Sequence, residues 1–536
     1  MSDDRDAFEP FERREHAVES AARTIVALSR RDRFGIGWRP KGVDEVAILL
    51  ESLGYSPEVV AELWYPDLFA LAHDVSAAVN RYVTDEERRE PPTLDWFTQT
   101  CRDYAIGSLY SAPWIVAVIG LAIFGASLWS SLSTPLHLAT AIALGVYAAQ
   151  IVSGFFSQGI ARRLTFYFLQ SNDSLMAWTV RRFVVAGLLT TALVSAGIFA
   201  GLAVFVGFSD AALAALFCAG TTIFQLALAP LYTLRRFTWI VALAIVATAI
   251  TGGTFVFVFH RHVDVPWEPA TLAVEVGLLG AAILATTMSW LARRAASSGA
   301  PVPPALESIV RSTFPYALFG ALYFLSILID RVAAGIAAAN GRGFAYASAY
   351  ELGADIALLA ILPVVGVINV MLESLPRRIL KGAEGGIRDL GKFDRSMLRF
   401  YGWGILAVAT ATLFAALIGE VVGPRLILSA RLGTIGDAAL SLAVLRVAIP
   451  AYGLVMLGLL NTQLLFFLSR PRAPVIGTAV GTIAALATCG WALAAHLSAE
   501  AMVGGLLASA LAFTAITTVA AVRTMRRFSY SYYAAY

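Results

Sequence analysis

Long apolar segments constrain this chain more than any other feature of its sequence. Runs of about twenty apolar residues, with no polar alternation, recur between residues 110 and 522. An α-helix needs ~20 such residues to cross ~30 Å of hydrocarbon, and only helices or closed barrels satisfy their backbone there. The sequence therefore predicts an all-α, polytopic membrane protein with about twelve transmembrane helices. We expect them near 110–132, 135–159, 183–207, 211–232, 237–259, 270–292, 314–337, 349–372, 400–420, 438–468, 474–496 and 500–522.

The distribution of charge divides the chain. Only 14% of its residues are charged, whereas a soluble protein is about one-quarter charged. Acidic side chains outnumber basic ones up to residue 109, and basic ones are in excess beyond it. We expect a cytoplasmic N-terminal helical extension (1–109), followed by an N-lobe with helices one to six (110–292). A cytoplasmic linker (293–313) leads to a C-lobe with helices seven to twelve (314–527) and a cytoplasmic tail (528–536).

Loop charges predict the orientation. The predicted inner loops are rich in arginine, whereas the outer loops carry only Arg261, Arg342, Arg425 and Arg431. Positive charge in short loops marks the cytoplasmic side, so we expect both termini there. A miscounted helix would reverse every later loop, so the alternation also supports an even number of spans. The extension has helical apolar spacing, and we interpret it as a docking or regulatory element, or otherwise as a passive extension.

Several function classes find no support in the sequence. Cys101, Cys218 and Cys489 form no CxxC pair, and the histidines are scattered, so we expect no metal and no cofactor. No GxxxxGK[ST] loop is present, which argues against a pump driven by nucleotide hydrolysis. The outer loops are short and offer no facing carboxylate pair, so an enzyme is disfavoured. We also expect no nucleic-acid partner.

Charged residues inside the predicted spans are the main candidates for function, because each costs ~2.5–3.5 kcal/mol to insert. Helical rise places them at a common depth in the outer part of the membrane, where they could form one network. One interpretation is a gate or substrate-contacting cluster, with Asp330 or Asp355 coupling to protons. The other is a static set of ion pairs that fixes helix packing. The candidates are Asp330, Arg331, Glu351, Asp355, Arg446 and Glu275.

A polar stripe marks the second predicted span. Tyr147, Gln150, Ser153 and Ser157 are spaced so that they share one helical face. Such a face lines an aqueous cavity or forms hydrogen bonds with a neighbouring helix. We include Gln150, Ser153 and Ser157 among the candidate residues of a substrate pathway. Pro230, Pro363 and Pro450 are positions at which helices could bend or break.

Three segments resemble a known family. YAIGSLYSAPWIVAVIG (104–120), FPYALFGALYFLSILIDR (314–331) and YELGADIALLAILP (350–363) are similar to motifs in the membrane subunit of Pel-type exopolysaccharide exporters. That family is a branch of the multidrug/oligosaccharidyl-lipid/polysaccharide flippase superfamily. The resemblance spans about residues 104–527. The chain departs from the family's pattern by its N-terminal extension of about 100 residues.

The resemblance implies a transporter of the bacterial inner membrane that moves a polysaccharide or lipid-linked glycan by alternating access or gating between two lobes. It also implies a cytoplasmic glycosyltransferase and accessory membrane subunits as partners, beside the lipid bilayer. Two alternatives stay open: a small-molecule or drug antiporter of the same superfamily, and a non-transporting membrane scaffold of a polysaccharide synthase complex. The three differ in what fills the space between the lobes.

Overall fold

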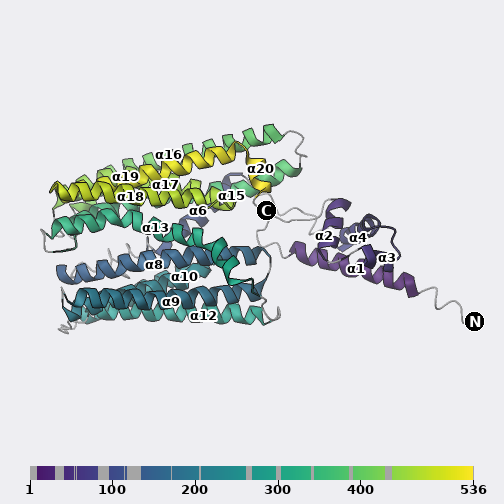
Figure 1. Cartoon of the computed structure of the whole chain (residues 1–536), viewed down its shortest axis with the longest axis horizontal. Helices are drawn as coiled ribbons and strands as arrows, with labels where there is room; N and C mark the ends of the chain where they lie inside the picture. Colours follow the sequence, from purple (N-terminus) through teal and green to yellow (C-terminus); the bar gives the residue numbers. More distant parts are fainter. Residues whose placement is uncertain are drawn as a thin grey trace, which may run out of the picture. The chain divides into compact units, whose positions relative to one another are not determined.

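The structure is a computed structural model in which every described element is a helix (Figure 1), as the sequence predicts. The chain divides into two compact units, Met1–Gln99 and Thr100–Tyr536. The division falls inside helix α6 (Trp96–Ser108), ten residues before the boundary expected from charge. The structure describes residues 9–30, 42–53, 55, 57–82, 96–113, 115–116, 135–170, 172–204, 207–260, 268–296, 303–339, 343–384, 390–428 and 437–534.

In the residues that the structure describes, the first unit contains four complete helices and has its own core. The core consists of small and aliphatic side chains, including Ala22, Ile25, Leu50 and Leu71. A polar group beside this core joins the first and last helices, because Arg14 contacts Asp74 at 3.1 Å. The helices are α1 (Glu9–Arg30), α2 (Val43–Ser52), α3 (Pro57–Glu62) and α4 (Leu68–Tyr82).

Asp74 also accepts a hydrogen bond of 2.7 Å from the Tyr65 hydroxyl, and the Arg14 guanidinium lies 3.9 Å from the centre of the Tyr65 ring. The Tyr65 hydrogen bond, followed by the contact with Arg14, lowers the pKa of Asp74 below its ordinary value. The charged form of Asp74 is therefore stabilised when this unit folds.

The second unit holds the membrane helices. Eleven segments of the described residues are long and apolar enough to cross a membrane, and each overlaps a predicted span. The first predicted span, 110–132, lies mostly outside the described residues, as do Arg261, Arg342, Arg431 and part of the linker. The segments are α8 (Leu136–Leu169), α9 (Asp173–Ala203), α10 (Phe208–Thr233), α11 (Phe237–His260), α12 (Glu268–Ala295), α13 (Leu306–Ala338), α14 (Ser348–Ile361) with α15 (Pro363–Glu384), α16 (Leu390–Ile427), α17 (Ala438–Phe467), α18 (Arg472–Ala494), and η2 (Ala499–Met502) with α19 (Val503–Met525).

One span is broken at a proline. α14 ends at Ile361 and α15 begins at Pro363, because proline has no N–H to continue the hydrogen-bond ladder. Pro230 and Pro450 instead lie inside the continuous helices α10 and α17. The break separates the polar first half of this span from its second half, which carries Glu373 and Arg377.

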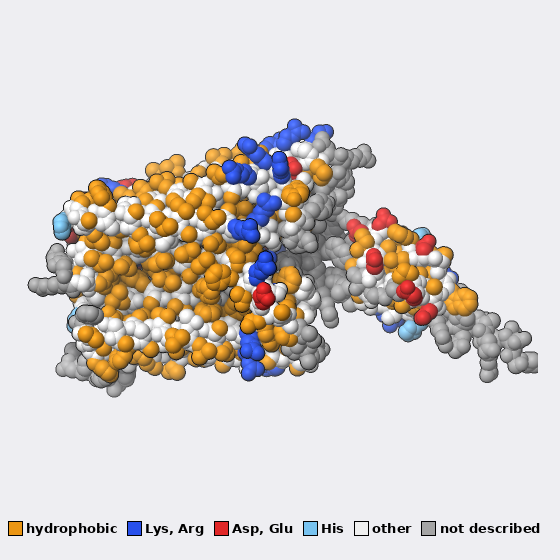
Figure 2. Space-filling view, viewed as in Figure 1, with side chains coloured by type: hydrophobic (Ala, Val, Ile, Leu, Met, Phe, Trp, Pro, Cys, Tyr) orange, Lys and Arg blue, Asp and Glu red, His pale blue; other side chains and the backbone are white. Residues whose placement is uncertain are grey.

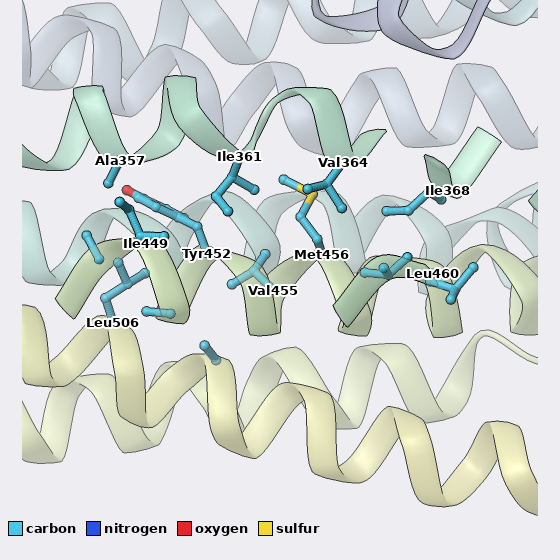
Figure 3. Close-up of a cluster of buried hydrophobic side chains, with 14 of the residues drawn as sticks. Ala357, Ile361, Val364, Ile368, Ile449, Tyr452, Val455, Met456, Leu460 and Leu506 are labelled. Carbon is cyan, nitrogen blue, oxygen red and sulfur yellow. The ribbon is translucent and has the colours of Figure 1, made fainter. Parts of the chain in front are cut away.

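The described membrane helices form two lobes with separate apolar cores. One core joins α8 to α12, and the other joins α13 to α20 (Phe528–Tyr533). In the second core, Ala357, Ile361 and Val364 face α17, from which Tyr452 and Met456 project toward them (Figure 3). Each lobe is therefore stabilised by its own buried side chains, and contacts between the lobes form a distinct set.

The two lobes meet along α8 and α13. Gly154 of α8 and Gly320 of α13 face each other so closely that a Cβ on Gly320 would collide with the Gly154 carbonyl oxygen. Small residues allow this close approach of two helix backbones. Phe324 of α13 also packs against Gly154. The middle of the interface is thus closed by close backbone approach together with the Phe324 side chain.

Basic side chains gather at one end of the bundle, where α8, α10 and α17 finish and α13, α16 and α18 begin. Figure 2 shows Lys and Arg side chains as a band across the bundle beside a broad apolar surface. We call this the basic end and the opposite one the far end. α20 also lies at the basic end, where the Ser529 backbone N–H donates to Asp394 of α16 at 2.8 Å.

Candidate functional site

An arginine of α13 is the centre of a buried polar cluster near the far end. Arg331 donates from Nη1 to Glu351 and, at 2.8 Å, to Asp355, both on α14. Its Nη2 donates to the Tyr452 hydroxyl of α17 at 3.2 Å. The side chains of Arg331 and Glu351 are only 8% and 5% exposed, whereas that of Asp355 is 61% exposed. The buried guanidinium is therefore shared between one enclosed and one accessible carboxylate.

A third carboxylate lies beside this cluster. Asp330 is fully buried and accepts a hydrogen bond of 2.6 Å from the Tyr350 hydroxyl. Its other oxygen has no hydrogen-bond partner among the described residues. Two successive residues of α13 thus pair with two successive residues of α14, Asp330 with Tyr350 and Arg331 with Glu351. These pairs belong to the segments that carry the family resemblance.

The cluster extends across the lobe interface. The hydroxyl of Tyr147, on α8 of the N-lobe, donates to Glu351 of the C-lobe. Nearby, the backbone N–H of Tyr346 donates to the hydroxyl of Thr140 at 2.9 Å. Glu351 therefore links the Arg331 ion pair to the opposing lobe, and these contacts join the lobes at the far end.

Contacts at the basic end also join the lobes. Arg163 of α8 donates to the Thr313 hydroxyl of α13 at 2.9 Å. Arg235, which follows α10, forms an ion pair with Glu373 of α15. Asp103 of α6, which precedes the N-lobe helices, pairs with Arg377 of α15 in the C-lobe. Any motion of one lobe against the other has to exchange these contacts.

The structure unites some of the predicted candidates and separates others. Asp330, Arg331, Glu351 and Asp355 come together, as expected. Arg446 does not join them, because it pairs with Glu420 of α16 at 3.2 Å on an exposed surface of the C-lobe. Depth along a helix follows from the sequence, but rotation about the helix axis relative to neighbours does not, and Arg446 projects from a different side of α17.

Glu275 is the other candidate outside the cluster. It lies on α12 in the N-lobe, and its Oε2 atom is buried without a hydrogen-bond partner among the described residues. Among the described residues, the hydrogen bonds that the N-lobe makes at the Arg331 cluster and beside it come from α8. A common depth therefore did not imply a common network for Glu275 either.

The polar stripe of α8 has two functions in packing. The Ser153 hydroxyl donates to the Gln225 side chain of α10, and it also lies 3.2 Å from the carbonyl oxygen of Gln150. Gln150 is buried, and Ser157 is half-buried. Ser153 therefore holds α8 against its own lobe, while Tyr147 reaches the other lobe. The hydrogen bond of Ser153 fits the helix-packing interpretation of the stripe, and the aqueous-cavity interpretation stays a prediction.

Sequence reasoning named Tyr147 in the polar stripe but missed the other two tyrosines of this site. Tyr350 and Tyr452 supply the hydroxyl groups that contact Asp330 and Arg331. Tyr350 directly precedes Glu351, which is the one local signal of its role. Tyr452 gives no such signal, because it lies about 120 residues away in sequence. Among the described residues, no group of three or more His, Cys, Asp and Glu side chains is arranged to hold a metal ion.

The arrangement can exchange one partner of Arg331 without dismantling the rest. Removing one member of a buried ion pair leaves an uncompensated charge, which is strongly unfavourable. Asp355 is accessible, so a proton or a cation that reaches it would weaken one of the two salt bridges to Arg331. Glu351 would carry that change to Tyr147 and so to the N-lobe.

Comparisons with known proteins find the likeness in structure. No protein-family model matches the chain, and no curated protein matches it. It is similar to an outward-facing multidrug resistance MATE family transporter of the MOP superfamily, with a TM-score of 0.53 and 14% identity over 80% of this chain and 95% of the other. The inward-facing form of such a transporter is similar with a TM-score of 0.50 and 14% identity, over 82% of this chain and 98% of the other.

A MOP superfamily transporter from Pyrococcus furiosus is similar too, with a TM-score of 0.54 and 14% identity over 80% of this chain and 96% of the other. The polarity of its binding pocket is described as reversed, suggesting a different function for that protein. Both structures match nearly their whole length to this chain. The chain therefore has the fold of MOP superfamily transporters.

Proposed function

We propose that the chain is a secondary transporter that moves a solute through the membrane by alternating contact between its two lobes. The observation that carries this proposal is the network from Tyr147 through Glu351 to Arg331, Asp355 and Tyr452. It places a buried, charged group on the interface between two separately packed lobes. Charges inside membrane helices mark substrate, ion or proton pathways.

The proposed substrate class is a small molecule, exchanged for protons or another cation. Glu351 and Asp355 contact one guanidinium, and Asp330 lies beside this cluster, so the site has an excess of negative charge when the three carboxylates are ionised. Asp355 is the accessible member and is the proposed exchange site. The fold neighbours described as multidrug resistance transporters support this class over the glycan export that sequence resemblance implied. We place the basic end in the cytoplasm, in line with the bias of basic loops.

The test uses purified chain in sealed proteoliposomes with an imposed proton gradient and fluorescent cationic dyes as probes. The proposal predicts gradient-dependent dye movement that Asp355→Asn lowers about tenfold or more. Glu420→Gln, which alters the exposed ion pair with Arg446, is the matched control and should leave transport within about twofold. Dye movement that is equal in both variants would remove Asp355 from the proposal.

Glycan export is the second candidate, and one observation favours it. The residues that pair in the cluster, Asp330 with Tyr350 and Arg331 with Glu351, are those of the exporter-like segments. In this case the bacterial inner membrane, a cytoplasmic glycosyltransferase and accessory membrane subunits are the proposed setting, and residues 1–99 are a proposed docking unit. Cells that secrete normal amounts of polymer with Asp355→Asn, together with a synthase that still co-purifies after deletion of 1–99, would argue against this candidate.

A further inference from the structure

A cavity at the basic end is lined by arginines. It has a volume of about 760 Å³ and lies where α8, α13, α17, α18 and α19 approach one another. Among its described lining residues there is no Asp or Glu. We call it the arginine pocket, and its arginines are Arg162, Arg311, Arg470, Arg472 and Arg523.

Among the described residues, these arginines have no acidic partner. Arg162 donates to the Ser469 hydroxyl at 3.2 Å and lies 4.6 Å from the centre of the Tyr316 ring. In the part of the chain that the structure describes, none of the pocket's arginines forms an ion pair with a carboxylate. Glu307 lies one turn before Arg311 on α13, yet the two are not paired there. Like charges that converge on one concave surface focus a positive potential and attract an anion.

The backbone adds further donors. α18 begins at Arg472, and both Arg472 and Ala473 line the pocket. The first N–H groups of a helix have no partner within the helix, and they carry partial positive charge. The pocket therefore combines guanidinium groups with the start of a helix of 23 residues. Together they form a donor set suited to an anion with several oxygen atoms.

The helix end of the N-lobe that contacts the C-lobe has an acidic partner, which the described lining of the arginine pocket lacks. α10 and α17 both end in a turn with one residue of positive φ, Arg235 at 55° and Ser469 at 54°. The next residue closes each turn, because Arg236 N donates to Leu231 O at 2.9 Å and Arg470 N donates to Leu465 O at 2.8 Å. The two helices thus end in the same way in the two lobes.

Each of these turns contacts the opposite lobe. The turn after α10 places Arg235 against Glu373 of α15, which is a cation against an anion. The turn after α17 places Ser469 against Arg162 of α8, with further arginines around them. In both cases the turn that ends a helix of one lobe contacts a helix of the other lobe. Among the described residues, the protein supplies a negative charge at only the first contact.

We propose that the arginine pocket binds a phosphate-bearing anion. The anion supplies negative charge between Arg162 and the arginines of the C-lobe, as Glu373 does at the contact with Arg235. Phosphate oxygens accept paired hydrogen bonds from guanidinium groups. The cavity volume falls within the range of small-molecule sites, ~300–1,000 Å³. Because Arg162 belongs to the N-lobe, the bound anion joins the lobes at the basic end. This inference does not depend on the identity of the transported solute.

The test measures binding by the full chain in nanodiscs of phosphatidylcholine, with inorganic pyrophosphate as a soluble probe. In a second arm, part of the lipid is replaced by phosphatidylglycerol. The test variant is Arg470→Gln with Arg472→Gln. The matched control is Arg181→Gln with Arg182→Gln, which removes the same charge from α9 outside the pocket. Arg523→Gln is a milder second test variant, and circular dichroism establishes that each variant is folded.

The proposal predicts that a probe raises the Tm of the wild-type chain, and that the double pocket variant weakens the apparent affinity about tenfold or more. The control should stay within about twofold. Stabilisation by pyrophosphate alone identifies a soluble phosphate compound, and stabilisation by phosphatidylglycerol that pyrophosphate reverses identifies a lipid headgroup. Absence of stabilisation by both probes, or equal losses in pocket and control variants, would overturn the proposal whether or not the chain transports dyes.

Discussion

The Arg331 cluster and the arginine pocket handle positive charge in opposite ways. In the cluster, a buried arginine is enclosed by Glu351, Asp355 and Tyr452. In the pocket, several arginines converge without a carboxylate among the described lining residues. In the cluster, carboxylates of the protein neutralise the guanidinium, so the contacts fix the structure and rearrange only when a partner is exchanged. In the pocket, the guanidinium groups are not neutralised by the described residues and are available to a ligand. The two ends of the lobe interface therefore suit different tasks.

The largest effect is expected at the centre of the cluster. Arg331→Met leaves Glu351 buried without its cation, which should lower the free energy of unfolding by about 3–5 kcal/mol. Folded yield and Tm in detergent measure this loss. Arg446→Ala is the control, because its exposed pair with Glu420 should contribute only about 0–1 kcal/mol. Similar Tm losses in the two variants would show that burial does not distinguish these arginines.

A change between the two ends tests whether they are mechanically joined. Gly320→Val places a branched side chain against the Gly154 backbone, so α8 and α13 must separate. Overpacking of this kind costs about 1–3 kcal/mol, and we expect transport to fall more than Tm does. Gly402→Val, at an exposed position of α16 with open space around it, is the control. Unchanged transport in Gly320→Val would contradict a closed α8–α13 contact as part of the cycle.

The ion pair at the basic end should have a smaller effect on stability. Glu373→Gln removes the partner of Arg235, and because this pair is partly exposed the loss should be about 1 kcal/mol or less. Measuring Tm with and without pyrophosphate tests whether this ion pair and the arginine pocket are coupled. An anion in the arginine pocket would hold the other contact, so Glu373→Gln should gain more in Tm from pyrophosphate than wild type does. An equal gain would indicate that the two contacts are independent.

The smallest effect is expected in the N-terminal unit, where the ion pair is exposed and lies outside the membrane. Folding lowers the pKa of Asp74, chiefly through the Tyr65 hydrogen bond. A lowered pKa stabilises the fold at pH values above the unfolded value of about 3.9, and this stabilisation is lost as pH falls through the folded value. The stability of Asp74→Asn should therefore depend less on pH below about 4 than that of wild type.

Chemical denaturation of residues 1–99, followed by circular dichroism from pH 7 to pH 3, measures this difference. Glu62→Gln, at an exposed carboxylate of the same unit, is the control. Parallel curves for wild type and Asp74→Asn below pH 4 would contradict the assigned role of the Asp74 contacts.

Apolar run length was enough to predict the helices. Each described span overlaps a predicted one, since ~20 apolar residues have few other solutions in a membrane. Glu351 and Asp355 are four residues apart on α14, a spacing that places both on one helical face, and both contact Arg331. Proximity in sequence made this part of the site predictable.

Other features depend on how helices rotate and which ones meet. Depth alone grouped Arg446 with the cluster, although its side of α17 faces Glu420. Tyr452, on the same helix, contacts Arg331 and carried no sequence signal. The arginine pocket was also hidden, because its residues come from separate basic loops that each resemble an ordinary cytoplasmic loop. The sequence pattern did not indicate which distant helices contact each other.

In the proposed transport cycle, the lobes exchange contacts at the far end and at the basic end in alternation. The most direct measurement is the distance between spin labels in a chain with Cys101→Ser, placed at His137→Cys and Ser498→Cys for the far end, and at Gln170→Cys and Arg526→Cys for the basic end. Glu351→Gln removes a charge that links the lobes, so we predict that it lengthens the far-end distance and shortens the basic-end distance relative to wild type. Distances at both ends that stay the same in Glu351→Gln would contradict the account.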